Sequence, residues 1–286
     1  MLLILGPTGQ VGTHVIAELG RRGTPFRAVV RTAAAAARVR EAGGQPVTGD
    51  LAHPETVAPH MADVSRMFLL TPGSPDQLRI QNRLVDSAKQ AGVAAVVKLS
   101  VYTAAEDSPC SLSRWHWAND EYLKASGLAW SILYPHTFMQ SIALQFARAV
   151  RDTGVIQAAV GPDKAISMVD VRDVAHVAAA VLCSDAHHGR EYLITGPEPL
   201  TYADCARKLS RSLGRHVDYV RVAPQTAHDL FTAGGFPEWL ADALVALFAM
   251  YDTGELNPIS DVTATLVGRP ARTFDDFLAD DLALFS

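Results

Sequence analysis

The chain has 286 residues, of which 49% are hydrophobic and 19% are charged, and its net charge is −5. This is the balance of an ordinary globular protein, and it provides no basic surface for nucleic acid. We see no signal peptide, no apolar run long enough to cross a bilayer, and no disulfide or metal-ligand spacing among the three cysteines, so a protein of the reducing cytoplasm is expected.

Short apolar runs alternate with helix-forming stretches over the first half of the chain. We expect strands at 2–5, 27–30, 45–47, 66–70, 95–99 and 130–133, and helices at 11–22, 33–42, 55–61, 77–91 and 115–126. Strands that are separated by helices pair in parallel. The pattern therefore predicts an α/β fold with a doubly wound parallel sheet of the Rossmann type.

The first loop of this pattern is glycine-rich and reads Gly6-Pro-Thr-Gly9-Gln-Val-Gly12. Gly6 permits a tight turn, Gly9 lets the backbone approach a pyrophosphate, and Gly12 lets the helix pack on the strand. The N–H groups that begin the helix favour phosphate. We expect the loop to hold a dinucleotide through Gly6, Thr8, Gly9, Gln10, Val11 and Gly12, and the alternative is a glycine-rich turn without a ligand.

The end of the second strand indicates which dinucleotide binds. Arg31 stands where an NAD-binding protein would carry an acidic residue, and its guanidinium suits the 2′-phosphate of NADP. We expect no acidic side chain near it, so NADP(H) is the predicted cofactor; the alternative for Arg31 is a solvated charge. After the third strand, Asp50 either lies near the adenine or only caps the following helix.

Beyond Pro135 the alternation changes and helices dominate. We expect helices at 137–151, 171–183, 202–213, 226–250 and 273–283, a short apolar run at 166–169, and one strand at 191–194 that returns to the first sheet. The pattern predicts a dinucleotide-binding domain at 1–153, joined by 191–194, that is interleaved with a smaller, mainly helical substrate-binding lobe at 154–286.

The carboxyl ends of the later strands are where parallel sheets place ligands. The cofactor is expected to continue past Thr71, Pro72, Ser100, Tyr134 and Pro135. Aromatic and methionine side chains suit a flat apolar substrate, so a pocket is expected from Tyr102, His136, Phe138 and Met139. For Phe138 and Met139 the alternative is packing in the core under the second lobe.

Taken together, these motifs resemble the NmrA-like branch of the atypical short-chain dehydrogenase/reductases, which includes quinone reductase-like and triphenylmethane reductase-like enzymes. The likeness covers nearly the whole chain. It rests on the glycine motif, on the single residues Arg31, Ser100, His116, Asp120 and Pro135, and on the segments 49–51, 126–133, 138–140 and 169–175. Many relatives carry an arginine just before Pro135, where this chain has Tyr134. That departure puts in doubt any contact the arginine would supply and suits a flatter, less anionic ligand.

The resemblance implies an NADPH-dependent reductase of a quinone-like or conjugated aromatic small molecule. Two alternatives remain open: a non-catalytic NADP(H) sensor that binds a protein partner, and a redox-neutral isomerase or cyclase. The expected partner is a small aromatic substrate and not a nucleic acid or a membrane. A homodimer is one oligomeric state that the sequence allows.

Proton transfer cannot use the tyrosine–lysine pair of ordinary short-chain dehydrogenases, because no lysine has a tyrosine four residues before it. The candidate proton donors are His116, Ser100 and Tyr102. His116 is placed near the start of a helix where related isoflavone reductase-like proteins present a lysine, and it is expected to be a protonated or neutral donor over the nicotinamide. The alternatives are packing beside Trp115 and Trp117 for His116, an ordinary strand end for Ser100, and packing for Tyr102. No metal site is expected.

Overall fold

Seven parallel strands form the central sheet of the computed structural model, which describes residues 1–286. Their order is β3-β2-β1-β4-β5-β6-β8, so the chain winds outward from β1 in one direction and then outward from β4 in the other. This confirms the doubly wound topology. The strands are β1 Leu2–Ile4, β2 Phe26–Val30, β3 Gln45–Thr48, β4 Arg66–Leu69, β5 Ala95–Leu99, β6 Ala129–Pro135 and β8 Arg190–Ile194.

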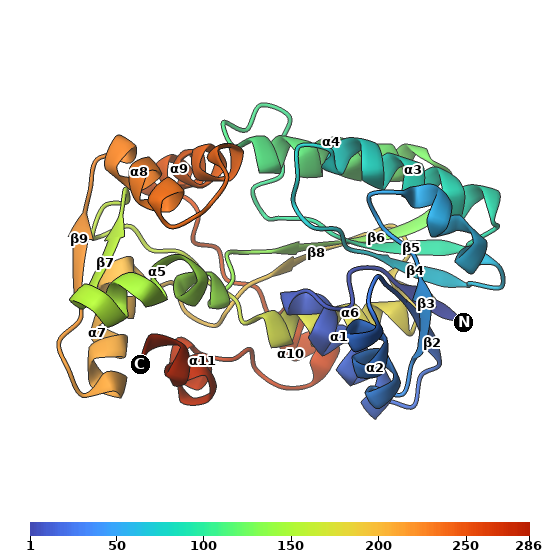
Figure 1. The fold of residues 1–286 in the computed structure, drawn as a ribbon, viewed down its shortest axis with the longest axis horizontal. Coiled ribbons are helices and arrows are strands. Elements are labelled where there is room, and N and C mark those ends of the chain that lie inside the picture. Colours follow the sequence, from blue (N-terminus) through green and yellow to red (C-terminus); the bar gives the residue numbers. More distant parts are fainter.

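Helices cover both faces of this sheet (Figure 1). One face is covered by α3 (Gln77–Gln90) and α4 (Ser111–Ala125), and the other by α1 (Gln10–Arg21), α2 (Ala33–Glu41) and α6 (Val171–Leu182), with α10 (Val262–Val267) packed on α6. Strands that are covered on both faces are nearly continuous apolar runs. That is why short runs such as Leu2–Ile4 read clearly as strands.

A second lobe surrounds a small parallel sheet at the other end of the molecule (Figure 1). Strands β7 (Val155–Ala158) and β9 (Asp218–Arg221) pair there, and neither was expected from the sequence. Five helices pack around them: α5 Gln140–Thr153, α7 Tyr202–Leu213, α8 Pro224–Ala233, α9 Glu238–Asp252 and α11 Phe274–Asp281. None of the helices combines the length and apolar character that crossing a bilayer requires.

The structure has three hydrophobic cores, one in the second lobe and one on each face of the central sheet, and they do not divide at residue 153. Phe146 and Val150 of α5 belong to the second lobe's core, whereas Val174 and Val177 of α6 belong to the core under the central sheet. The chain therefore crosses from one lobe to the other several times. The apolar faces of these two helices, and not their order in the chain, decide which core each helix joins.

Two expected helices also differ in the structure. The segment expected as a helix at 55–61 forms two short 3-10 turns, Pro54–Thr56 and Ala58–Met61. The helix expected at 226–250 is broken into α8 and α9 by Gly235, which has a φ of +89°, and by Pro237. The short run at 166–169 makes only isolated bridges.

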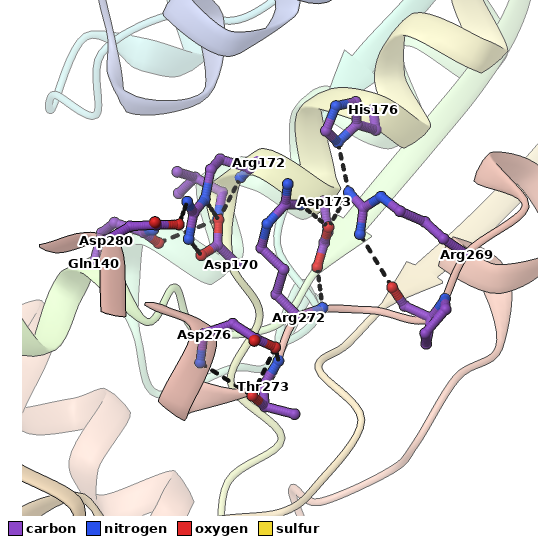
Figure 2. Close-up of polar contacts among 12 residues, drawn as sticks. Gln140, Asp170, Arg172, Asp173, His176, Arg269, Arg272, Thr273, Asp276 and Asp280 are labelled. Atoms are coloured by element: carbon purple, nitrogen blue, oxygen red, sulfur yellow. Dashed lines mark hydrogen bonds and ion pairs between the residues drawn. The ribbon is translucent and has the colours of Figure 1, made fainter. Parts of the chain in front are cut away.

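A polar network fastens the carboxyl-terminal segment to the start of α6 (Figure 2). The fully buried Asp173 accepts hydrogen bonds from the Arg269 guanidinium at 2.7 Å and from the Arg272 backbone N–H at 2.6 Å. Beside it, Arg172 of α6 pairs with Asp280 of α11. These contacts tie α11, which packs in the second lobe, to a helix of the first lobe.

Candidate active site

The glycine-rich loop joins β1 to α1 with geometry that requires glycine at Gly6 and Gly12. Gly6 has a φ of +66°, and a Cβ on Gly12 would lie 2.0 Å from the Gly6 carbonyl oxygen. Gly9 precedes α1 without a side-chain cap, and the first turn of α1 contains no acidic residue. The backbone N–H groups at the start of α1 are therefore available to an anion, which fits a pyrophosphate.

A groove of about 560 Å³ runs from this loop across the carboxyl ends of the strands. Nine of the residues expected to hold the cofactor line it: Gly6, Thr8, Gly9, Gln10, Val11, Arg31, Asp50, Thr71 and Pro72. Gly12 lies beneath the loop, where it allows α1 to approach Gly6. The structure thus brings most of the expected cofactor residues into one cavity.

Arg31 lies at the end of the groove formed by β2 and α2, and it is 71% exposed. Contrary to the expectation of no acidic neighbour, the Asp50 carboxylate lies 4.0 Å from its guanidinium. Asp50 lines the groove and accepts a hydrogen bond from the Ala52 N–H at 3.0 Å, but it does not cap the 3-10 turn Pro54–Thr56, whose N-cap position is His53. Arg38 of α2, which the sequence analysis did not single out, lines the same end of the groove and adds a second cation.

A second, smaller cavity of about 170 Å³ lies between the central sheet and the second lobe. Phe138 lines both cavities, so they meet at this side chain. Tyr102, Pro135 and His136 also line the smaller cavity. Met139 does not: it is fully buried in the core of the second lobe, so the packing alternative holds for this residue.

Three stacked rings form one wall of the smaller cavity. The centroid of the His136 ring lies 5.0 Å from that of Tyr102 and 6.0 Å from that of Tyr251. The Nδ1 atom of His136 accepts from the Thr137 N–H at 2.7 Å, and its Nε2 donates to the Leu256 carbonyl at 3.0 Å. Both ring nitrogens are therefore occupied, and His136 serves as a flat, neutral surface.

Burial lowers the pKa of His136 from 6.5 to about 4, so folding should become less favourable in mild acid. A histidine whose pKa falls on folding binds a proton more tightly in the unfolded chain than in the folded one. Protonation therefore favours the unfolded state, and the folded state loses stability as the pH falls from 6.5 towards 4. We expect the free energy of unfolding to drop by about 2 kcal/mol between pH 7 and pH 5 on this account. Urea unfolding of wild type and His136→Phe at both values checks this, because the variant should show a smaller pH dependence.

A buried polar network lies behind the junction of the two cavities. The carboxylate of Asp120 on α4 accepts from Lys98 Nζ at 2.6 Å and from Ser100 Oγ at 2.6 Å. All three side chains are at most 1% exposed. Burial and the neighbouring Asp120 raise the pKa of the Tyr134 hydroxyl, so Tyr134 presents a neutral group to this carboxylate. Ser100 and Tyr134 therefore belong to this network and do not line the cofactor groove.

His116 lies at the edge of the same network. Its Nδ1 is 3.4 Å from Lys98 Nζ, and burial together with this ammonium group holds its pKa well below the usual value. The imidazole is therefore neutral, with Nδ1 as an acceptor. His116 lines neither of the two cavities, and its neutrality removes the protonated form from the expected roles.

Lys98 and its pairing with Asp120 are the main features of the site that sequence reasoning missed. Lys98 is the one charged residue in the apolar run Ala95–Leu99. A lysine in a strand that is covered on both faces requires a buried acidic partner, and this was a usable signal. The identity of that partner follows only from the packing of α4 on β5.

The sequence pattern of the NmrA-like family matches residues 1–278. The chain belongs to the NmrA-like family. This NmrA-like chain is 37% identical to an NAD(P)H azoreductase of Xenophilus azovorans, over 100% of its own length and 99% of the relative's. It is 32% identical to a (4-alkanoyl-5-oxo-2,5-dihydrofuran-3-yl)methyl phosphate reductase of Streptomyces griseus, over 100% and 99% of the two chains.

Solved structures show the same fold. An NADPH-dependent quinone oxidoreductase from Escherichia coli, in complex with NADPH, superposes with a TM-score of 0.88 at 25% identity and covers 98% of this chain and 99% of its own. The Citrobacter triphenylmethane reductase in complex with NADP(H) has a TM-score of 0.87 at 23% identity, and the match covers 98% of this chain and 99% of the reductase. The resemblance read from the motifs is therefore confirmed at the level of family and fold.

Proposed function

We propose that the protein is an NADPH-dependent reductase of quinone-like or conjugated aromatic small molecules. The observation that carries this proposal is the junction at Phe138 between a phosphate-binding groove and an aromatic cavity. A dinucleotide that extends from Arg31 to Phe138 would bring its nicotinamide to the mouth of the cavity. The azoreductase and the quinone oxidoreductase named above support the same class of reaction.

The residues of the groove fit this cofactor. The free N–H groups at the start of α1 would bind the pyrophosphate, and Arg31 with Arg38 would bind the 2′-phosphate. When bound, NADPH supplies the hydride, which is the demanding part of the chemistry. The protein's remaining tasks are to orient a flat acceptor against the ring wall and to deliver a proton.

Tyr102 is the best placed of the three candidate proton donors. It lines the cavity, and its hydroxyl has no hydrogen-bond partner within the protein. The Ser100 hydroxyl already donates to Asp120, and His116 lies outside the cavity. We therefore assign proton delivery to Tyr102, whereas Ser100, Lys98 and Asp120 fix the end of β5 from which Tyr102 projects.

Arg31 should discriminate between the two dinucleotides. Hydrogen bonds to a charged group contribute about 1.5–3 kcal/mol, so we expect Arg31→Ala to weaken NADPH binding by about 10- to 100-fold. NADH binding should not change, since it has no 2′-phosphate. Fluorescence titration with both nucleotides checks this, and Arg40→Ala, on the adjacent helix α2 but outside the groove, is the matched control. Equal losses for NADPH and NADH would contradict the assignment.

The proposal is tested by titrating the purified protein with NADPH and NADH and then adding a panel of quinones and azo dyes while the absorbance of the reduced nicotinamide is followed. Tight NADPH binding with turnover supports a reductase. Tight binding without turnover would shift the assignment to a sensor or a redox-neutral enzyme. Failure to bind NADPH would overturn the proposal.

A further inference from the structure

A third groove, of about 590 Å³, lies between the two lobes beside α1. One side is formed by α5, and the other by the first turns of α1, the start of α6 and the carboxyl-terminal 3-10 turn Leu282–Phe285. The groove meets the cofactor groove at Gln10 but shares no residue with the smaller cavity, so the reaction proposed above makes no use of it. Its volume is within the range of roughly 300–1,000 Å³ that is typical of small-molecule sites.

A large part of the lining of this third groove is apolar and exposed. Leu144 of α5 is 61% exposed and Leu284 on the opposite side is 46% exposed, which makes them two of only eight large hydrophobic side chains exposed on the molecule. Ala143 and Ala147 line the groove from the same face of α5, and their small side chains leave space for a ligand. Exposed apolar side chains that gather around one hollow indicate a binding site for an apolar group.

Two cations with free hydrogen-bond donors line the groove at the carboxyl end of α5. Arg151 donates a hydrogen bond to the Leu284 carbonyl and has no carboxylate partner. Arg148 pairs only with Asp152, at 3.5 Å, and both of these side chains are largely exposed, so their pairing contributes little. Both guanidinium groups are therefore available to an anionic group of a ligand.

The other end of the groove offers no such cation. Arg172 is already paired with Asp170 and Asp280. Burial lowers the pKa of His14, so its imidazole is neutral, and Asp281 lies beside it. A ligand with one negative charge is therefore oriented in the groove, with its charge near the carboxyl end of α5 and away from Asp281.

From this arrangement we infer that the groove is a second binding site, for a linear aliphatic monocarboxylate of the fatty-acid type. The carboxylate pairs with Arg148 and Arg151, and the chain lies along α5 over its two alanines. The groove-lining residues of α5 run from Gln140 to Arg151, which spans about 16 Å at the helical rise of about 1.5 Å per residue, so an extended chain fits along the helix. The site is separate from the catalytic one, and the inference does not depend on the proposed function.

The first test is a calorimetric titration of the full-length protein with decanoate, decanol and acetate, in the presence of NADP⁺ to keep these ligands out of the cofactor groove. Decanoate should bind about tenfold more tightly than decanol, which has the chain without the charge. Acetate, which has the charge without the chain, should not bind measurably. Absence of decanoate binding, or equal affinity for decanoate and decanol, would overturn the inference.

Leu144→Glu tests whether decanoate binds in this groove. The change places a negative charge at an exposed position of the lining, so it should abolish decanoate binding and leave the midpoint of thermal unfolding unchanged. Leu230→Glu is the matched control, because Leu230 lies on α8 outside the groove and is 41% exposed, and it should bind decanoate like wild type. Decanoate binding that survives in Leu144→Glu, or that is lost equally in both variants, would overturn the inference.

The combined variant Arg148→Gln with Arg151→Gln tests the role of the charge. Decanoate affinity should fall about tenfold, to the level of decanol, whereas decanol affinity should not change. Arg211→Gln, at an exposed position of α7 outside the groove, should behave like wild type. Equal losses for decanoate and decanol would mean that the two arginines act through the shape of the groove, and this result would overturn the assigned carboxylate contact.

Discussion

Gly12→Ala is expected to destabilise the fold and abolish cofactor binding together. The new Cβ would lie 2.0 Å from the Gly6 carbonyl oxygen, so α1 would have to move away from the loop. Overpacking of this kind costs about 1–3 kcal/mol, and displacement of the helix N-terminus should weaken NADPH binding by more than about 100-fold. Urea unfolding and NADPH titration of the variant measure the two effects.

Gly9→Ala is the companion variant that separates these effects. Its Cβ would approach the Gly6 carbonyl oxygen only to 3.6 Å, which is an ordinary contact, and Gly9 has a φ of −77° that any residue adopts. The methyl group would lie in the groove, so NADPH affinity should fall while the midpoint of thermal unfolding stays the same. A loss of stability equal to that of Gly12→Ala would contradict the roles assigned to the two glycines.

The second large effect is expected from Asp120→Asn. This change leaves the Lys98 ammonium buried without its carboxylate, and it also weakens the acceptor of the Ser100 hydroxyl. Removing one partner of a buried ion pair typically costs about 3–5 kcal/mol. We expect a loss of this size in the free energy of unfolding, measured by urea titration.

A double variant shows whether the ionic pair itself is responsible. Replacing both partners, as Lys98→Met with Asp120→Leu, removes the unpaired charge and should recover most of the lost stability. It should not recover reductase activity if the pair positions Ser100 and the end of β5. A double variant as unstable as Asp120→Asn would mean that packing, and not the buried charge, explains the loss.

The sequence was sufficient to predict the central sheet and most of the cofactor groove. Parallel strands covered on both faces have short apolar runs, and the motif from Gly6 to Gly12 is local, so both can be read without knowing the tertiary structure. Arg31 could be predicted because it directly follows the last residue of β2. These predictions rest on local sequence patterns, namely an apolar run that marks a strand and a motif or residue that directly follows a strand end.

The rest of the site depends on contacts between distant segments. Lys98 and Asp120 meet only because α4 packs on β5, and Tyr251 of α9 lines the smaller cavity only because the second lobe packs beside the central sheet. Met139 is a residue that was expected in the substrate pocket but does not line it. Its apolar side chain suited a substrate pocket equally well, and only the packing of the second lobe places it in the core.

The network around Asp173 (Figure 2) has a consequence for engineering. Val262 packs on the core of the first lobe, Phe274 lies in the core of the second, and Arg269 and Arg272 between them are anchored on α6. No single continuous stretch of chain therefore encodes the second lobe. Replacing one continuous segment by that of a relative would disrupt the cores of both lobes. The set of substrates that the protein accepts is therefore better altered by single substitutions of residues that line the smaller cavity.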